Sequence, residues 1–340
     1  MRFVVVGLGA IGGTLAVRLW QAGYPVVGVA RGAQRTAIVQ DGLRLETPAE
    51  RLTAPIDVVR HIGDVTFGQG DVVVLAVKSQ DTSAILSAMV GAVPRETPVL
   101  CAQNGVVNEA WALRFFPRVY GVVVMCPAAF LRPGVVQAHS SPITGLLDVG
   151  CYPGGEDSVS REIAALLSEA TFDARSIPDV MRWKYAKLLI NLGNAAEAVC
   201  GPEARSGPLT RLLQEEGETV LRAAGVDYAS AAEDKTRRGD LLVVQPAGGE
   251  TRSGGSTWQS LARGTGVTEV DYLSGEVVML GRLHGIPTPA NAYLQKLTAD
   301  MARAKSRPGS RTDDEVLAEL SKTAVDQAGD AELRSAIGDA

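Results

Sequence analysis

The sequence predicts an α/β fold in two parts: an N-terminal Rossmann domain with a doubly wound, mostly parallel sheet, and a mostly α-helical C-terminal domain. Three observations support this prediction. Short β-branched runs alternate with helical patterns through the first half of the chain, as expected of βαβ units. Beyond residue 178 these runs give way to long helical patterns. The length of 340 residues also favours two hydrophobic cores over one.

The first half begins with a strand at residues 2–6, RFVVV, followed by a helix at residues 10–22 that Gly23 would end. The run DVVVLAV at residues 71–77 has the continuous apolar character of a parallel strand that is covered on both faces. Further strands are expected at residues 26–30, 98–102 and 119–125, and a further helix at residues 83–90.

The second half is expected to contain three long helices, at residues 179–199, 207–224 and 267–284. Glycine and charged residues are frequent at residues 237–255, which predicts a loop between the second and third of these helices. The strand signals of the first half do not recur, so this region is predicted to be mostly helical.

The change of pattern near residue 178 divides the chain into domains. Residues 1–177 are predicted to bind a dinucleotide, and residues 178–305 to form a helical substrate and catalytic domain. The remaining tail, residues 306–340, is expected to be partly helical or disordered. Within the tail, Thr312 and Glu315 match a helix capping box.

Composition argues against several classes of partner. The formal net charge of −5 provides no basic field for nucleic acid or an anionic membrane surface. No apolar stretch is long enough to span a bilayer. The four cysteines form no CxxC pair and the three histidines are isolated, so we expect neither a metal site nor a disulfide framework. Reduced cysteines fit a cytoplasmic location.

A glycine-rich motif directly follows the first strand and opens the first helix, which is the setting that a dinucleotide-binding turn requires. The first glycine permits a tight turn, the second leaves room for the pyrophosphate, and the third lets the helix pack closely. The N-terminus of the helix then presents N–H groups and a positive dipole end to the phosphates. The predicted cofactor-binding residues are Gly7, Leu8, Gly9, Ala10, Ile11 and Gly12.

The end of the second strand favours NADPH over NADH. NAD enzymes usually place an Asp or Glu there, where it accepts hydrogen bonds from the ribose hydroxyls. This chain has no carboxylate at residues 28–32 and places Arg31 where a 2′-phosphate would lie. Because a guanidinium offers charge and forked donors to a phosphate, Arg31 is predicted to select NADPH/NADP+.

A polar stripe follows the helix predicted at residues 179–199. Its members are Lys184, Lys187, Asn191 and Asn194, which are three or four residues apart and therefore share one face. A carbonyl that accepts hydride needs its oxygen polarised and then protonated, so the stripe offers a donor for this chemistry. The stripe fits either a polar site or a solvated surface, and asparagines among leucines favour the site.

A single glutamate, Glu269, lies near apolar neighbours inside the helix predicted at residues 267–284. It could pair with Lys187 or accept a hydrogen bond from a substrate hydroxyl. By spacing alone, a glutamate on the helix surface is the plainer explanation.

Taken together, these motifs resemble those of the ketopantoate reductase family (2-dehydropantoate 2-reductases), from Met1 to about Ala302. The resemblance implies NADPH-dependent reduction of a small 2-oxo acid, first of all ketopantoate to pantoate in pantothenate and coenzyme A synthesis. Its marks are GLGAIGG at the start, Lys78 in AVKSQDT, Gln103-Asn104-Gly105, Lys187-x-x-x-Asn191, TEVDY at residues 268–272 and HGIPTP at residues 284–289.

The resemblance also implies roles for single residues. Lys187 matches the family's catalytic lysine, which polarises the ketone and donates the proton, and Glu269 matches its active-site acid. Asn104 matches an asparagine near the nicotinamide and the substrate, and Asn191 matches a substrate-binding asparagine. Lys78 matches a lysine on the cofactor side of the site.

The substrate-binding residues match less closely. The family's carboxylate-binding serine should precede Glu269 by about three turns, which gives Thr257, with Ser256 beside it as an equal candidate. The family's second asparagine falls on Ala195 here, and Asn194 lies one residue early. Asn194 is kept as a substrate-binding candidate.

These departures leave two alternatives. The chain could act on a different carbonyl substrate of a specialised pathway, because the departures lie where a substrate would be held. A retained nucleotide motif beside a degenerate active site would instead make a non-enzymatic NADPH-binding sensor. The presence of Lys187, Asn191 and Glu269 disfavours the sensor. A homodimer is left open as the assembly state.

Overall fold

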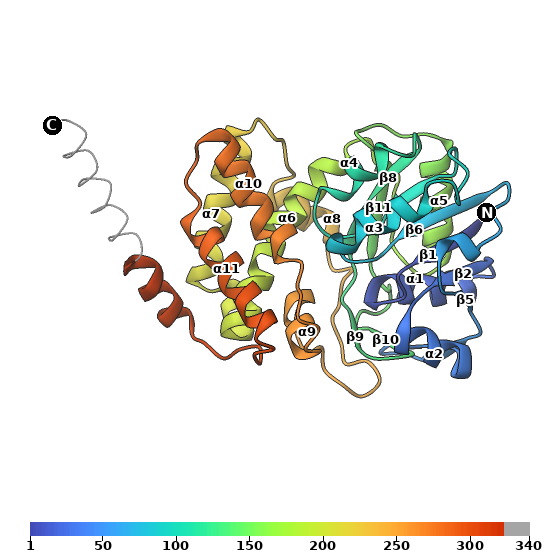
Figure 1. Ribbon diagram of the computed structural model, residues 1–340, viewed down its shortest axis with the longest axis horizontal. Helices are drawn as coiled ribbons and strands as arrows, with labels where there is room; N and C mark the ends of the chain where they lie inside the picture. Colours follow the sequence, from blue (N-terminus) through green and yellow to red (C-terminus); the bar gives the residue numbers. More distant parts are fainter. Residues whose placement is uncertain (323–340) are drawn as a thin grey trace. The chain divides into compact units, whose positions relative to one another are not determined.

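The computed structural model describes residues 1–322, in which the chain packs as two compact units (Figure 1). The first unit contains Met1–Leu188 and Tyr228–Ser253. The second contains Leu189–Asp227 and, of the described chain, residues 254–322. Each unit has its own buried apolar side chains.

Seven strands of residues 1–322 form the main sheet of the first unit, in the order β11-β8-β7-β6-β1-β2-β5. Neighbouring strands are parallel except β11, which runs antiparallel to β8. The predicted mostly parallel sheet is therefore confirmed. The strands are β1 (Arg2–Val6), β2 (Val26–Val29), β5 (Asp57–Val59), β6 (Asp71–Leu75), β7 (Val99–Cys101), β8 (Val119–Met125) and β11 (Leu146–Cys151).

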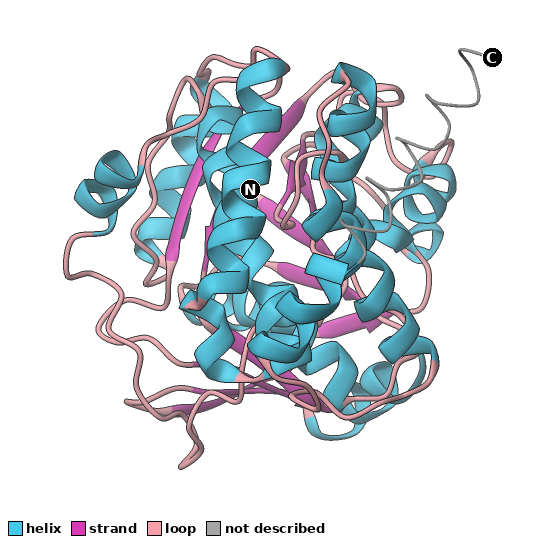
Figure 2. Ribbon diagram, turned by 90° about the vertical axis from the view of Figure 1, so that its left-hand side faces the viewer, coloured by secondary structure: helices cyan, strands magenta, loops and turns pink. Residues whose placement is uncertain are grey.

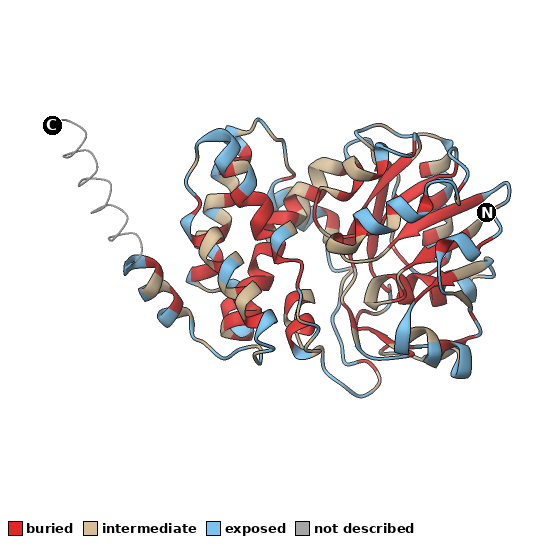
Figure 3. Cartoon of the chain, in the orientation of Figure 1, coloured by how far each residue is buried: buried red, intermediate tan, exposed pale blue. Residues whose placement is uncertain are grey.

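Helices cover both faces of this sheet, so its central strands are buried (Figures 2 and 3). Phe3 and Val5 of β1 lie in one apolar core with side chains of α1 and α5. Val4 and Val6 point to the other face and pack with α3 and α4. This is the doubly wound arrangement that the sequence predicts. The helices of the first unit are α1 (Ala10–Gln21), α2 (Gly32–Asp41), α3 (Ser79–Met89), α4 (Asn108–Leu113), α5 (Ser158–Glu169) and α8 (Ala231–Arg238).

A second, smaller sheet was not predicted from the sequence. Within the described chain it has four strands, in the order β4-β3-β10-β9, and α1 packs between the two sheets. The packing is close, because a β-carbon on Gly13 of α1 would lie 2.7 Å from the Val136 side chain. The strands are β3 (Leu43–Glu46), β4 (Arg51–Ala54), β9 (Ala128–Arg132) and β10 (Val135–Ala138).

The segment after α8 also belongs to the first unit, as far as Ser253. The sequence predicts a loop at residues 237–255, and most of that segment is irregular. Arg237 anchors its start, because its guanidinium pairs with the Asp148 carboxylate of β11 at 2.6 Å. The predicted boundary at residue 177 follows the change of sequence pattern, whereas the packing first divides after Leu188.

The second unit is helical, and it includes the carboxyl half of α6. α10 packs against α7 and α11, and α11 also packs against α9. The crossing of α6 and α7 depends on Gly217, where a β-carbon would lie 2.7 Å from the Leu189 side chain. The first two long helices are confirmed. The elements are α6 (Val180–Cys200), η2 (Pro202–Ser206), α7 (Pro208–Ala223), α9 (Ser256–Ala262), η3 (Val270–Tyr272), α10 (Ser274–His284) and α11 (Pro289–Arg303).

The prediction of a single helix at residues 267–284 is wrong for its first part. A 3₁₀ turn, η3, comes first, and Leu273 separates it from α10 with φ −117° and ψ −86°. Val270, Leu273 and Val277 are all buried at intervals of three and four residues. The apolar period therefore continues across the break, which is why the sequence pattern did not reveal it.

The predicted capping box at the start of the tail is confirmed. The Thr312 backbone nitrogen donates to the Glu315 carboxylate at 3.0 Å, and the Glu315 nitrogen donates to the Thr312 hydroxyl at 3.3 Å. A helix follows at residues 313–322. The rest of the predicted tail lies outside the described residues. Among residues 1–322, no helix combines the length and the apolarity needed to cross a bilayer.

Candidate active site

The glycine motif forms the turn between β1 and α1. Gly7 has φ +97°, and a β-carbon there would lie 2.9 Å from the Val77 backbone nitrogen. A β-carbon on Gly12 would lie 2.8 Å from that of Ala76 and would overlap the Gly7 carbonyl oxygen. A β-carbon on Gly9 would meet no atom of the described residues within 4 Å beyond its own local backbone and chain neighbours. The motif thus has the tight turn, the close packing and the open side that pyrophosphate binding needs.

The N-terminus of α1 can accept an anion. Gly9 is the N-cap residue and gives no side-chain cap, and the first turn of the helix has no acidic residue. Its N–H groups and dipole therefore favour a phosphate. Gln34 of α2 holds the turn in place. Its Nε2 donates to the Leu8 carbonyl at 2.6 Å, and its Oε1 accepts from the Gly134 nitrogen at 2.7 Å.

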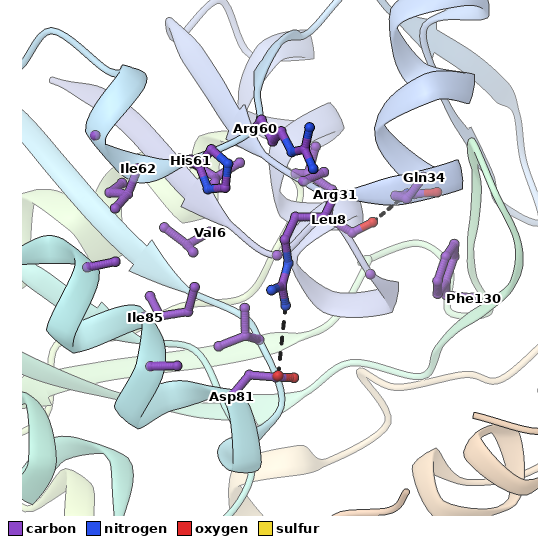
Figure 4. A pocket seen from close by; sticks show the side chains of 18 residues that line it. Val6, Leu8, Arg31, Gln34, Arg60, His61, Ile62, Asp81, Ile85 and Phe130 are labelled. Atoms are coloured by element: carbon purple, nitrogen blue, oxygen red, sulfur yellow. Dashed lines mark hydrogen bonds and ion pairs between the residues drawn. The ribbon is translucent and has the colours of Figure 1, made fainter. Parts of the chain in front are cut away.

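A cavity of about 620 Å³ adjoins this turn within the first unit (Figure 4). Arg31 extends into it from the end of β2, and its guanidinium pairs with the Asp81 carboxylate of α3 at 3.8 Å. Arg60 and His61, which follow β5, line the same cavity. Because β5 runs parallel to β2, the ends of both strands lie on one edge of the sheet. Arg60 has no signal in the sequence, because β5 is only three residues long.

Lys78 and Asn104 lie on that same edge, after the neighbouring parallel strands β6 and β7. Lys78 is the N-cap residue of α3. Asn104 lies in the loop before α4, where its carbonyl accepts a hydrogen bond from Asn108 Nδ2 at 3.2 Å. Gln103 ties the two loops together, since its Nε2 donates to the Val77 carbonyl at 2.8 Å. The structure therefore places both residues on the sheet edge that holds the glycine turn.

Lys184 is not on a solvated face. Its side chain is 3% exposed, and its ammonium lies 2.5 Å from the fully buried Glu109 carboxylate. The ammonium also donates to the Gln103 carbonyl at 2.9 Å. The solvated-surface alternative therefore does not hold at Lys184, and this lysine supports the loop that holds Asn104. The buried pair has no signal in the sequence, because its partners are distant along the chain.

The other members of the polar stripe follow along α6. Lys187 is half-buried, and Asn191 and Asn194 are buried. The Asn194 amide nitrogen lies 3.4 Å from Asn191 Oδ1 and 3.5 Å from the Ser256 hydroxyl oxygen. Ser256 and Thr257 belong to the first turn of α9, and Thr257 is buried. The structure thus places the Ser256 hydroxyl beside Asn194.

Glu269 precedes η3 and does not lie inside a long helix as predicted. Its side chain is buried. Burial lowers the pKa of the nearby Arg263 guanidinium, and the Glu269 carboxylate opposes this shift by raising it. Arg263 therefore lies within electrostatic reach of Glu269. Across residues 1–322, no group of His, Cys, Asp or Glu side chains is placed to hold a metal ion.

The first unit is a Rossmann unit with this glycine turn and cavity, and α6, which carries Lys187, continues into the helical unit. These features define the class of the protein as a dinucleotide-dependent oxidoreductase. More specifically, the chain belongs to the ketopantoate reductase family. The family model for ketopantoate reductase PanE/ApbA matches residues 3–154, and the model for its C terminal region matches residues 179–302. The resemblance found in the sequence motifs is therefore confirmed.

Known proteins are similar over almost the whole chain. A 2-dehydropantoate 2-reductase of Pyrococcus horikoshii is 25% identical over 305 residues, which cover 87% of this chain and 96% of the relative. A PanE/ApbA family ketopantoate reductase of Ralstonia eutropha has a similar structure, with a TM-score of 0.75 and 29% identity. That match covers 90% of this chain and 99% of the other. A D-mandelate dehydrogenase shares the fold, with a TM-score of 0.76, 21% identity and coverage of 90% and 99%.

Proposed function

We propose that this chain reduces 2-dehydropantoate (ketopantoate) to pantoate with NADPH, as a cytoplasmic step in the synthesis of pantothenate and coenzyme A. The main support is the family match across both domains. Further support comes from Lys187, Asn191 and Glu269, which match the family's active-site residues. A homodimer remains a prediction for its assembly.

Lys187 performs the proton chemistry in this proposal. When bound, NADPH supplies the hydride that the carbonyl carbon of the 2-oxo acid accepts. The Lys187 ammonium donates a hydrogen bond to the carbonyl oxygen and then gives that oxygen its proton. The product is a 2-hydroxy acid, and the lysine, left neutral, regains a proton from solvent.

The remaining residues bind and orient. Asn104, Asn191 and Asn194 supply amide groups, and a hydroxyl of Ser256 or Thr257 contacts the substrate carboxylate, with Ser256 favoured by its position beside Asn194. Glu269 either holds Lys187 or accepts from a substrate hydroxyl. Lys78 belongs to the cofactor side, with the glycine turn.

We propose that Arg31 selects NADPH over NADH, together with Arg60, which lines the same cavity. Arg31→Ala should raise the KM for NADPH about 10- to 100-fold, because a charged hydrogen bond is worth about 1.5–3 kcal/mol. Steady-state kinetics with both cofactors checks this prediction. The KM for NADH, which has no 2′-phosphate, serves as the internal control and should change little. An equal rise for both cofactors would contradict the assignment.

The substrate itself is tested by initial rates on a panel of 2-oxo acids. We expect the highest kcat/KM for ketopantoate, since the relatives matched over most of the chain bear that activity in their names. The replacement at Ala195 motivates the rival, a reductase of another carbonyl compound. A panel member that exceeds ketopantoate by tenfold or more in kcat/KM would establish the rival.

A further inference from the structure

Arg205 lies at the centre of a polar cluster in the second unit, and the sequence motifs do not include it. It belongs to η2, and its side chain is 35% exposed. Its Nη1 donates to Asn194 Oδ1 at 2.6 Å and to Glu197 Oε2 at 2.6 Å. Glu197, only 7% exposed, also accepts from the Gly255 backbone nitrogen at 3.1 Å. One guanidinium nitrogen thus ties η2 to α6, and Glu197 in turn links α6 to the start of α9.

This contact decides which way the Asn194 amide faces. A guanidinium can only donate, so the amide oxygen must face Arg205 and the amide nitrogen must face away. The nitrogen then lies 3.5 Å from Ser256 Oγ and 3.4 Å from Asn191 Oδ1. Amide orientation is often ambiguous, but a charged donor on one side removes the ambiguity here.

The orientation of the Asn194 amide also sets the hydrogen-bond roles of its neighbours Ser256 and Asn191. The Ser256 oxygen faces an amide donor, which leaves its own O–H to donate in another direction. Likewise, Asn191 presents its oxygen to Asn194, so its amide nitrogen is the donor end of that side chain. The Ser256 hydroxyl would then offer a donor to an anionic group, as a substrate carboxylate requires.

The same cluster fixes the backbone where α9 begins. Gly255, the N-cap residue of α9, is so closely surrounded that a β-carbon would lie 2.7 Å from Glu197 Oε2 and 2.8 Å from Asn194 Oδ1. A larger residue at position 255 would therefore displace these polar side chains. The ion pair between Arg205 and Glu197 balances their charges, which argues against Arg205 itself as the ligand of a substrate carboxylate.

We propose that Arg205 and Glu197 are positioning residues, which orient Asn194, and through it Ser256 and Asn191, to bind the carboxylate of the 2-oxo acid. This inference rests on the proposed function and extends it. It also gives a physical role to Asn194, the position where the chain departs from the family's asparagine pattern. Asn194 lies one residue before the family's position, and in this proposal it can still serve substrate binding because Arg205 orients its amide.

The test begins with Arg205→Met. We expect the KM for the 2-oxo acid to rise about 10- to 100-fold, with kcat within about threefold and the Kd for NADPH unchanged, because binding of the carboxylate is lost without loss of the lysine chemistry. Arg205→Lys keeps a cationic donor and should recover part of the loss. Arg211→Met is the matched control, since Arg211 is exposed and donates to the Ser206 carbonyl instead.

A double-mutant cycle with Ser256→Ala separates positioning from a merely structural role. If Arg205 acts through Ser256 and Asn194, Arg205→Met should add less than about threefold to the KM of Ser256→Ala. An equal penalty in both backgrounds would overturn the proposal, as would a fall in kcat or NADPH binding that matches the rise in KM.

The activity of the unmodified chain on a panel of 2-oxo acids distinguishes failure of this inference from failure of the proposed function. If it reduces another 2-oxo acid but not ketopantoate, the proposed substrate is wrong, and the cycle is measured on that acid instead. If it reduces no 2-oxo acid, both the proposed function and the positioning role are overturned.

Discussion

Lys187→Ala should lower kcat about 10²- to 10⁴-fold, the usual contribution of a positioned general acid, and should leave the Kd for NADPH within about threefold of its original value. The cofactor motif lies at the β1–α1 turn, whereas Lys187 lies on α6, so removal of this ammonium touches none of the glycine contacts. Single-turnover kinetics and a fluorescence titration with NADPH measure the two quantities separately.

Lys187→Arg is the informative companion variant. A guanidinium keeps the positive charge near the carbonyl oxygen but does not release its proton in this pH range. We therefore expect it to recover little of the lost rate. Full activity of either variant would show that another group protonates the product. Parallel loss of NADPH binding would indicate a folding defect and would contradict a purely chemical role.

Lys184→Met should lower the free energy of unfolding by about 3–5 kcal/mol, because it leaves a buried carboxylate without its counter-charge. Glu109 is fully buried, and its ammonium partner lies 2.5 Å away. The same substitution removes the donor to the Gln103 carbonyl and should therefore also disturb the loop that holds Asn104. Urea unfolding followed by circular dichroism provides the measurement.

The double variant Lys184→Met/Glu109→Leu is the control for this prediction. Replacing both charges with apolar side chains removes the unpaired buried charge, so much of the lost stability should return. The double variant should be more stable than Lys184→Met alone. If Lys184→Met changes the free energy of unfolding by less than about 1 kcal/mol, the pair is not buried in solution as described.

Elements with strong local patterns could be predicted from the sequence. β1, β6 and β8 are continuous apolar runs, and α1 follows a motif whose glycines each meet a specific steric demand. The second sheet lacked such a pattern, because each of its four strands (LRLE, RLTA, AAFLR and VVQA) is short and includes polar or charged residues. Its β3 and β10 pair in parallel from segments far apart in the chain, and only the folded packing creates that pairing.

The candidate site shows the same division between local and distant information. The glycine turn, Arg31 and the polar stripe of α6 are local patterns, and family resemblance supplied the roles of Lys187 and Glu269. Helical spacing alone could not show that Lys184 turns inward to Glu109, a residue 75 positions away. The role proposed for Arg205 likewise could not be predicted from the sequence. It depends on two hydrogen bonds to α6 that form only when η2 folds back against that helix.

The most direct test of the central claim is NADPH oxidation by the purified chain, followed at 340 nm with and without ketopantoate and repeated with NADH. The account predicts rapid oxidation of NADPH that depends on ketopantoate, yields pantoate, and is much slower with NADH at the same concentration. Tight NADPH binding without oxidation by ketopantoate would contradict the proposed reaction while leaving the nucleotide site in place.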